Sequence, residues 1–342
     1  MAAPARSLPT LDSDMKTHAI RIHETGDPSV MNWEEIDIGQ PGPDEILLRH
    51  TAIGFNMIDT YHRSGLYPTP PKPCGLGGEA AGVIEAVGKK VKGFKPGDHA
   101  AYGGSAIGLG AYAEARIIKP DWVTKLPRWM DDRVAAAILT KGRTVEYLFS
   151  RTHKLQKGET ILFHAAAGGV GLIAGQWAKS LGAVAIGVVG SPEKAKVAQR
   201  NGYKHVVVAG ETDIAEAVMR ITKGRGVDVV YDSVGKDTWQ ASLDSVRKLG
   251  LVVSFGSASG DPPPYNVSLD GRKNSAFIHR ATMPNYMTTP EIAAASAAKV
   301  FAMIKKGAIK ARINDSYRLK DVARLHRDAE ARLTTGQVVI LP

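Results

Sequence analysis

The chain of 342 residues has a single cysteine, Cys74, and no long hydrophobic run. One cysteine cannot form an intrachain disulfide, which excludes a disulfide-stabilised secreted scaffold and agrees with a reducing compartment. No apolar segment reaches the length of about 20 residues that a membrane-spanning helix needs. The first residues also contain no hydrophobic signal core. We therefore expect residues 1–15 to form a flexible tail and the protein to be soluble and cytoplasmic, without membrane insertion.

Acidic residues are outnumbered, with 34 against 44 lysines and arginines, which gives a formal net charge of +10. The basic residues come as scattered pairs such as Lys89 with Lys90 and Lys305 with Lys306, and the sequence has no basic run or aromatic-basic motif. A solvated surface explains most of this charge, so a nucleic-acid partner is not expected. Excess positive charge near a cleft would suit a ligand that carries several phosphates.

The most informative segment is TILFHAAAGGVG, residues 160–171. A buried strand over 161–163 leads into Gly168, Gly169 and Gly171, and a helix is expected over 172–181. Glycines at such a crossing permit a tight turn and bring the amides of the helix N-terminus close to a pyrophosphate. The pattern is a variant of GxGxxG, because Ala166 replaces the first glycine, and a purely structural turn is the alternative.

Around this turn, short apolar runs alternate with helical segments. We expect strands over 184–189, 205–208, 227–231 and 251–255, and helices over 192–201, 213–222 and 239–249. This alternation predicts parallel strands joined by right-handed crossovers. The sequence therefore predicts a Rossmann domain, with a doubly wound parallel sheet, over residues 141–284.

The end of the second strand of this domain bears on the choice of dinucleotide. An NAD site usually carries an acid there that binds the adenosine ribose, but this strand ends Val-Val-Gly-Ser, with no acid before Glu193. Ser191 can donate a hydrogen bond to a 2′-phosphate and Lys194 can add a positive charge, so NADPH is favoured. The alternative is that Ser191 only caps a helix and Lys194 is a solvated surface lysine.

The remainder of the sequence shows a different pattern, and the length of the whole chain predicts a second domain. Short alternating segments over 46–50, 80–87 and 111–118 predict a mostly antiparallel, barrel-like domain. A helix over 131–150 leads into the nucleotide domain. The final segment holds a long helix over 291–306 and a strand over 338–341, and we expect it to return to the first domain, leaving the cofactor in the cleft between the two.

Five blocks in consistent order carry a family resemblance. They are AIGFNMIDTYHRSGLYP (52–68), GGEAAGVIEAVG (77–88), FHAAAGGVGLIAGQWAK (163–179), VVYDSVGKDTW (229–239) and VVSFGSASG (252–260). Together they resemble the quinone oxidoreductases, the zeta-crystallin-like, zinc-free branch of the medium-chain dehydrogenase/reductase superfamily. The resemblance implies an α/β protein in which a GroES-like β-barrel catalytic domain, residues 16–140 and 285–342, packs against the Rossmann domain. It also implies a homodimer and NADPH as hydride donor.

The same resemblance bears on metal binding. Zinc-containing relatives place a metal-binding cysteine at or beside the position of Asn56, and a His-Glu pair where this chain has Gly78 and Glu79. Since Cys74 is the only cysteine, no thiolate-based zinc site can be built. We expect no metal site, and a quinone, already a strong electrophile, needs mainly alignment and polarisation of one carbonyl.

By resemblance, three residues surround the substrate and the nicotinamide: Asn56, Tyr61 and Tyr67. The amide of Asn56 can donate a hydrogen bond, and the tyrosines supply ring walls and hydroxyl groups. Solvent could supply the final proton. The alternatives are that Asn56 is a turn residue after Gly54 and that the two tyrosines serve ordinary packing.

The cofactor contacts also transfer residue by residue. The family's nicotinamide-side threonine corresponds to Thr144, and its arginine near the cofactor corresponds to Arg280. The pyrophosphate turn corresponds to Ala167, Gly168, Gly169 and Val170, the phosphate pair to Ser191 and Lys194, the wall after the fifth strand to Phe255 and Gly256, and a 2′-phosphate ligand to Arg332. Close relatives often carry a stacking tyrosine where this chain has Ala209, a departure that would weaken NADPH affinity or its preference over NADH.

These observations predict an NADPH-dependent quinone reductase that transfers hydride to a small-molecule quinone. One alternative is reduction of an activated carbon–carbon double bond in an enone or acrylate, since the same hydride geometry serves a conjugate acceptor. Another is an RNA-binding or structural, crystallin-like role, which the intact glycine turn and Asn56 would make an additional role.

Overall fold

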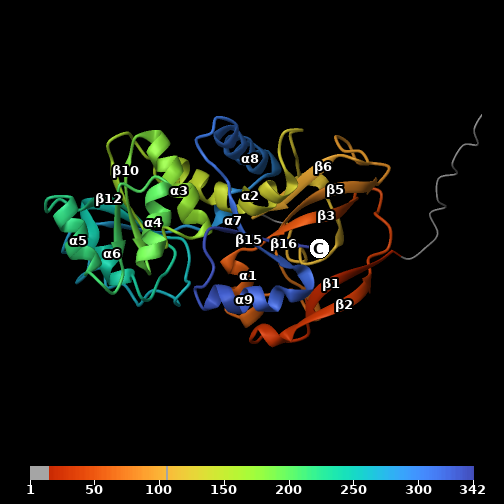
Figure 1. Cartoon of the computed structure of the whole chain (residues 1–342), viewed down its shortest axis with the longest axis horizontal. Helices are drawn as coiled ribbons and strands as arrows, with labels where there is room; N and C mark the ends of the chain where they lie inside the picture. The colour runs from red at the N-terminus through yellow and green to blue at the C-terminus, as the bar shows by residue number, and fades with distance from the viewer. Residues whose placement is uncertain (1–14, 105–106) are drawn as a thin grey trace, which may run out of the picture.

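The computed structural model describes residues 15–104 and 107–342, so all but Met15 of the tail expected over residues 1–15 lies outside the described residues. Two domains lie side by side (Figure 1). The α/β domain with α3 to α6 occupies one end, and the N-terminal strands occupy the other. The C-terminal elements α9, β15 and β16 lie among those N-terminal strands, as expected for a final segment that returns to the first domain.

The α/β domain is built on a six-stranded sheet in the order β11-β10-β9-β12-β13-β14. Every neighbouring pair is parallel. Numbered within the domain, this order is 3-2-1-4-5-6, the classical dinucleotide-binding order, which confirms the predicted Rossmann topology. The strands are β9 (Thr160–Phe163), β10 (Val184–Val189), β11 (His205–Val208), β12 (Val227–Asp232), β13 (Val246–Ser254) and β14 (Phe277–Arg280).

The crossover helices begin where the sequence supplies caps. Ser191 accepts a hydrogen bond from the Lys194 amide at the start of α4, and Asp213 does the same for Glu216 at the start of α5. Gly182, in the left-handed conformation, ends α3. The helices are α3 (Gly169–Leu181), α4 (Pro192–Arg200), α5 (Ile214–Ile221) and α6 (Trp239–Ser245).

One predicted helix of this domain is wrong in its second half, and one strand was not predicted. The helix expected over 239–249 ends at Ser245, because Val246 is buried and pairs with Val227 at the start of β13. The ladder then shifts register, and Leu249 takes a positive φ of 56°. β14 was not predicted because it is short and mostly exposed, with no apolar run to reveal it.

The other domain contains a three-stranded sheet, β2-β1-β4, and a sheet in the order β15-β16-β3-β5-β6-β8, with β7 paired to β3. All pairs are antiparallel except β15 with β16, which agrees with the predicted mostly antiparallel domain. The strand expected over 111–118 is shorter, since β7 begins at Ala115. The strands are β1 (Lys16–Ile22), β2 (Met31–Asp37), β3 (Ile46–Gly54), β4 (Cys74–Gly75), β5 (Glu79–Val87), β6 (His99–Gly103), β7 (Ala115–Ile118), β8 (Thr124–Lys125), β15 (Ile313–Arg318) and β16 (Gln337–Leu341).

The helix α2 (Asp132–Tyr147) joins the two domains. It packs against β3, β5 and β6 on one side and against α3 on the other, and α8 (Pro290–Lys305) packs beside it. A single hydrophobic core includes Ala52 and Ala81 of the first domain together with Ile161 and Phe163 of the second. This shared core sets the relative orientation of the two domains. The expected boundaries at 140/141 and 284/285 stay predictions, and α2 is continuous across the first.

The remaining helices are short or lie at the domain junction. They are α1 (Met57–Ser64), α7 (Met283–Tyr286), α9 (Val322–Glu330), the 3-10 turns η1 (Pro28–Val30), η2 (Pro120–Trp122) and η4 (Leu319–Asp321), and the π-helical turn η3 (Leu148–Thr152) that continues α2. In the described part of the chain, no helix has the length and apolar character needed to cross a lipid bilayer.

Candidate active site

The glycine turn joins β9 to α3 at the carboxyl edge of the parallel sheet. α3 begins at Gly169, with Gly168 as its N-cap, so the turn lies where the sequence pattern placed it. A Cβ added at Gly171 would lie 2.4 Å from the carbonyl oxygen of Ala165 and 2.6 Å from that of Ala166. Ala165 itself has a φ of 53°, a conformation that normally favours glycine. The first amides of α3 have no acceptor within the helix and can bind an anion.

A C-terminal segment that we call the strap, residues 331–336, lies against this turn. The amide of Gly336 donates to the carbonyl of Ala167 at 3.0 Å, and Gly336 forms a parallel bridge with Gly168. The side-chain amide of Gln337 donates to the carbonyl of Gly169 at 3.0 Å. Segments more than 160 residues apart in sequence thus meet at the turn, and no local sequence signal indicates this contact.

The residues assigned to the 2′-phosphate lie together beside the turn. Ser191 Oγ accepts from the amide of Lys194, and Lys194 Nζ donates to the carbonyl of Arg332 at 2.7 Å. Burial lowers the pKa of Lys194, and the charge of Arg332 lowers it further. Ala209 follows β11, and its amide donates to the carbonyl of Val189 at the end of β10, two residues before Ser191.

Asn56 belongs to the first domain and lies at the start of α1. It caps α1, and its backbone amide donates to Asp59 Oδ2 at 2.9 Å. The side-chain nitrogen of Asn56 donates to Glu79 Oε2 at 2.7 Å, which fixes the orientation of the amide and leaves one N–H and the carbonyl oxygen for other partners.

Glu79 is the centre of a buried polar cluster that was not predicted from the sequence. Its side chain is fully buried, and its second oxygen accepts from the amide of Thr140 at 2.6 Å. Lys141 Nζ lies 3.8 Å from Glu79 and donates to the carbonyl of Phe55 at 2.8 Å. Burial lowers the pKa of Lys141, while the carboxylates of Glu79 and Asp59 oppose that shift. The only sequence signal for this cluster is the position of Glu79, which by resemblance corresponds to the glutamate of the His-Glu pair in zinc-containing relatives.

Tyr61 and Tyr67 lie where the two domains meet. Their rings pack edge to face at 5.3 Å between centroids, and the amide of Tyr67 donates to the carbonyl of Tyr61. Burial raises the pKa of Tyr61 to about 12, with Tyr67 adding to the shift, while a hydrogen bond with the backbone of Ser257 opposes it. Both tyrosines therefore contact residues of the Rossmann domain: Tyr61 contacts Ser257, and Tyr67 contacts Arg280.

Arg280 links the ends of β13 and β14 to the tyrosines. One guanidinium nitrogen donates to the Tyr67 hydroxyl oxygen at 3.1 Å, and the other donates to Ser254 Oγ at 2.9 Å and to the carbonyl of Gly256 at 3.1 Å. Phe255, between these two residues, packs against Phe163 in a tilted arrangement with 5.6 Å between ring centroids. Arg280 thus connects Gly256, one of the wall residues predicted after the fifth strand, to Tyr67.

The remaining candidates lie along α2 and α3. Thr144 is buried one turn after Thr140, and its hydroxyl donates to the Thr140 carbonyl at 2.9 Å. Its oxygen can still accept a hydrogen bond, but its proton is committed to the helix. Val170, in the first turn of α3, is half-buried. Within residues 15–104 and 107–342, no group of three or more His, Cys, Asp or Glu side chains could hold a metal ion.

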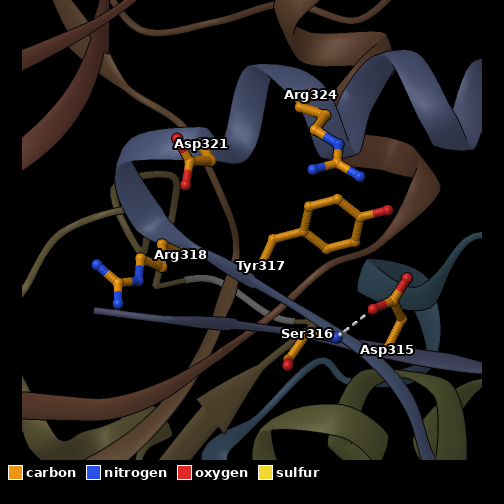
Figure 2. A pocket seen from close by; sticks show the side chains of 6 residues that line it. All are labelled: Asp315, Ser316, Tyr317, Arg318, Asp321 and Arg324. Carbon is orange, nitrogen blue, oxygen red and sulfur yellow. Dashed lines mark hydrogen bonds between the residues drawn. The ribbon is translucent and has the colours of Figure 1, made fainter.

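A separate depression of about 240 Å³ lies between β15 and the start of α9 (Figure 2). Arg324 stands over the ring of Tyr317, whose hydroxyl donates to Asp328. The depression is lined by Asp315, Ser316, Tyr317, Arg318, Asp321 and Arg324, and none of the predicted site residues is among them. The candidate site is the junction between the domains.

Comparison with known proteins agrees with this geometry. The family model described as "Alcohol dehydrogenase GroES-like domain" matches residues 42–128, and the one described as "Zinc-binding dehydrogenase" matches residues 169–297. A quinone oxidoreductase of Pseudomonas aeruginosa is 47% identical over 94% of this chain and 99% of its own. The chain belongs to the quinone oxidoreductase family. The resemblance read from the five sequence blocks, and the two-domain fold class, are confirmed.

Solved structures of quinone oxidoreductases share the whole architecture. The Escherichia coli quinone oxidoreductase complexed with NADPH superposes with a TM-score of 0.92 at 43% identity, covering 95% of this chain and all of that one. A 2-haloacrylate reductase of Burkholderia sp is 40% identical over 94% of this chain and 98% of its own. The family therefore includes relatives named for two kinds of electrophilic substrate.

Proposed function

We propose that this quinone oxidoreductase family member is an NADPH-dependent quinone reductase that works without metal. The observation that carries the proposal is the junction itself. We assign cofactor binding there to the glycine turn, Lys194 and Arg332, and substrate binding to Asn56, Tyr61 and Tyr67. The identity to quinone oxidoreductases and the NADPH complex of the Escherichia coli relative support it.

The residues present fit NADPH. A side chain at Gly171 would collide with the backbone carbonyls of Ala165 and Ala166, so glycine here keeps the turn tight and directs the first amides of α3 towards a pyrophosphate. We assign the pyrophosphate to residues 167–170 and the 2′-phosphate to Ser191, Lys194 and Arg332. Thr144, Phe255, Gly256 and Arg280 would then border the nicotinamide end.

Bound NADPH supplies a hydride. When a quinone accepts it, one carbonyl oxygen gains negative charge, and the free N–H of Asn56 and the hydroxyls of Tyr61 and Tyr67 are the donors available to stabilise that oxygen. Arg280 donates to the Tyr67 oxygen and so leaves the Tyr67 proton free for the substrate. A proton from solvent completes the hydroquinone. Glu79 holds the Asn56 amide in the orientation that this role requires.

A spectrophotometric assay tests the proposal. With 1,4-benzoquinone and a bulkier naphthoquinone, we expect rapid oxidation of NADPH, slower oxidation of NADH and no loss of rate in the presence of a chelator. Inactivity towards both quinones despite measurable NADPH binding would refute the quinone assignment and keep the cofactor assignment. Loss of activity with chelator that zinc restores would refute the metal-free mechanism.

Reduction of activated carbon–carbon double bonds is a second candidate function. The 40% identity to a 2-haloacrylate reductase favours it, and the same donors would stabilise an enolate oxygen. An enone and 2-chloroacrylate belong in the same assay. Turnover of these compounds without turnover of quinones would make this the function.

We also propose a homodimer formed through β14. In the described residues β14 is an edge strand of the six-stranded sheet, so one side of its backbone is unpaired. Large apolar side chains are exposed on it and in the segment that precedes it in the chain, including Phe277 at 63%, Val267 at 77% and Leu269 at 68%. A second copy of this chain, added edge to edge, would bury these side chains and continue the sheet.

Replacing Phe277 by glutamate should convert the dimer to a monomer, because it places a charge on this apolar edge strand. Sedimentation velocity over a concentration series measures the change. Trp33→Glu, a similar substitution at an exposed aromatic residue on β2, is the control and should remain dimeric. An F277E protein that sediments as the wild type would refute the β14 interface.

A cytoplasmic location, consistent with the single cysteine, is part of the proposal.

A further inference from the structure

Arg332, the proposed 2′-phosphate ligand, has an acidic partner. Its guanidinium nitrogen lies 3.3 Å from Asp237 Oδ2, and both side chains are exposed. Asp237 belongs to the loop between β12 and α6, whereas Arg332 belongs to the strap. Arg332 also has a positive φ of 60°, and its carbonyl accepts from Lys194.

These contacts place the strap across the nucleotide-binding edge of the sheet. Lys194 follows β10 and Asp237 follows β12, and these strands flank β9 on its two sides. Arg332 contacts Lys194 in the first turn of α4 and Asp237 in the loop after β12, while Gly336 bonds to the turn after β9. The carboxyl ends of these strands are where a dinucleotide binds in this topology.

Asp237 is held in place by its loop. Its amide donates to Ser259 Oγ at 3.0 Å, from the segment after β13. At the start of the loop, the buried carboxylate of Asp232 accepts from the amides of Val234 and Gly235 and from the Thr238 hydroxyl. These contacts hold the backbone of Asp237, so its carboxylate stays close to the guanidinium that a phosphate would need.

We propose that Asp237 sets the strength of the NADPH preference. Its carboxylate pairs with Arg332. The 2′-phosphate of NADPH must displace this carboxylate from Arg332 and then lies near its negative charge. NADH has no 2′-phosphate, so its binding does not require the displacement. Asp237 therefore lowers the affinity for NADPH specifically and favours release of NADP⁺. This inference rests on the proposed role of Arg332 in binding the 2′-phosphate.

Exposed ion pairs are weak, so we expect Asp237 to change the affinity for NADPH only moderately. Replacing Asp237 by asparagine removes both the competing acceptor charge and the repulsion, and we expect NADPH and 2′,5′-ADP to bind about three- to tenfold more tightly. Binding of NADH and 5′-ADP should change by less than about twofold. The gain should shrink as salt concentration rises, because the charges are exposed.

Isothermal titration calorimetry on the full-length protein tests this with 2′,5′-ADP and 5′-ADP as probes. The variants are D237N, R332A and the double mutant, with D244N as a control that removes an acid paired to Lys273 in the same domain. We expect D237N to bind only 2′,5′-ADP more tightly, R332A to lose preference for 2′,5′-ADP, and the D237N gain to vanish in the double mutant.

The outcomes separate the two proposals. If R332A loses the preference for 2′,5′-ADP but D237N binds like the wild type, the role of Asp237 is overturned and the 2′-phosphate assignment stands. An equal gain for both probes in D237N, or a similar gain in D244N, also overturns it as a general charge effect. If R332A weakens both probes equally, the 2′-phosphate assignment fails, and the role of Asp237 fails with it.

Discussion

Replacing Gly171 by alanine should weaken NADPH binding by about two orders of magnitude and lower the melting temperature by several degrees. The added Cβ would lie 2.4 Å from the Ala165 carbonyl oxygen and 2.6 Å from that of Ala166. Both are backbone atoms, so the clash cannot be relieved by rotating a side chain. The turn must move, and with it the helix amides assigned to the pyrophosphate.

Fluorescence titration with NADPH and thermal denaturation measure the two effects. Gly78→Ala is the matched control, since an added Cβ there meets no atom within 4 Å and Gly78 does not have a positive φ. It should bind NADPH like the wild type. A G171A protein with wild-type affinity and melting temperature would contradict the assignment of the pyrophosphate to this turn.

Local sequence patterns predicted the Rossmann domain well because its strands are short, buried apolar runs separated by capped helices. β10 and β11 have the predicted bounds, and β9 differs by one residue. The error over residues 246–249 has a tertiary cause, since Val246 pairs with Val227 in the sheet although its spacing from preceding apolar residues suits a helix. β14 lies at an exposed edge, where burial leaves no pattern to read.

The candidate site also contains features that local sequence predicts and contacts that it does not predict. The glycine turn and the Ser191–Lys194 cap are local, so their geometry follows from adjacent residues. The contacts between Lys194 and Arg332, between Arg280 and Tyr67, and between Gly336 and Ala167 join residues more than 130 positions apart. Periodicity carries no information about such contacts. For Arg332 and Arg280, only family resemblance indicated a place near the cofactor.

Replacing Glu79 by glutamine should destabilise the fold by about 3 kcal/mol and lower kcat at least tenfold. Glutamine cannot balance the buried charge of Lys141, and its NH2 group would face the donor of either Asn56 or Thr140. The Asn56 amide must then turn over or lose its partner, which disturbs the group proposed to contact the reduced oxygen. Urea denaturation and steady-state kinetics measure the two losses separately.

The pH dependence of the stability of E79Q shows whether the unbalanced charge of Lys141 causes the loss of stability. Lys141 has a pKa below its usual 10.5 in the folded protein, so the unfolded chain binds more protons between the two values and stability rises with pH there. Without Glu79 the folded pKa falls further, so the deficit of E79Q should shrink as pH rises from 7 towards 10.

Two further variants separate the effect of Glu79 on the charge of Lys141 from its effect on Asn56. E79Q/K141M removes both charges and should recover most of the stability, less the hydrogen bond of Lys141 to the Phe55 carbonyl, but not the kcat, because the Asn56 contact is still altered. E85Q, on the same strand, removes an acid whose partner Arg49 is partly exposed, and it should change stability by less than about 1 kcal/mol. If E79Q were as stable as E85Q and fully active, Glu79 would neither balance Lys141 nor orient Asn56, and the amide would have to be positioned by its backbone contact with Asp59 alone.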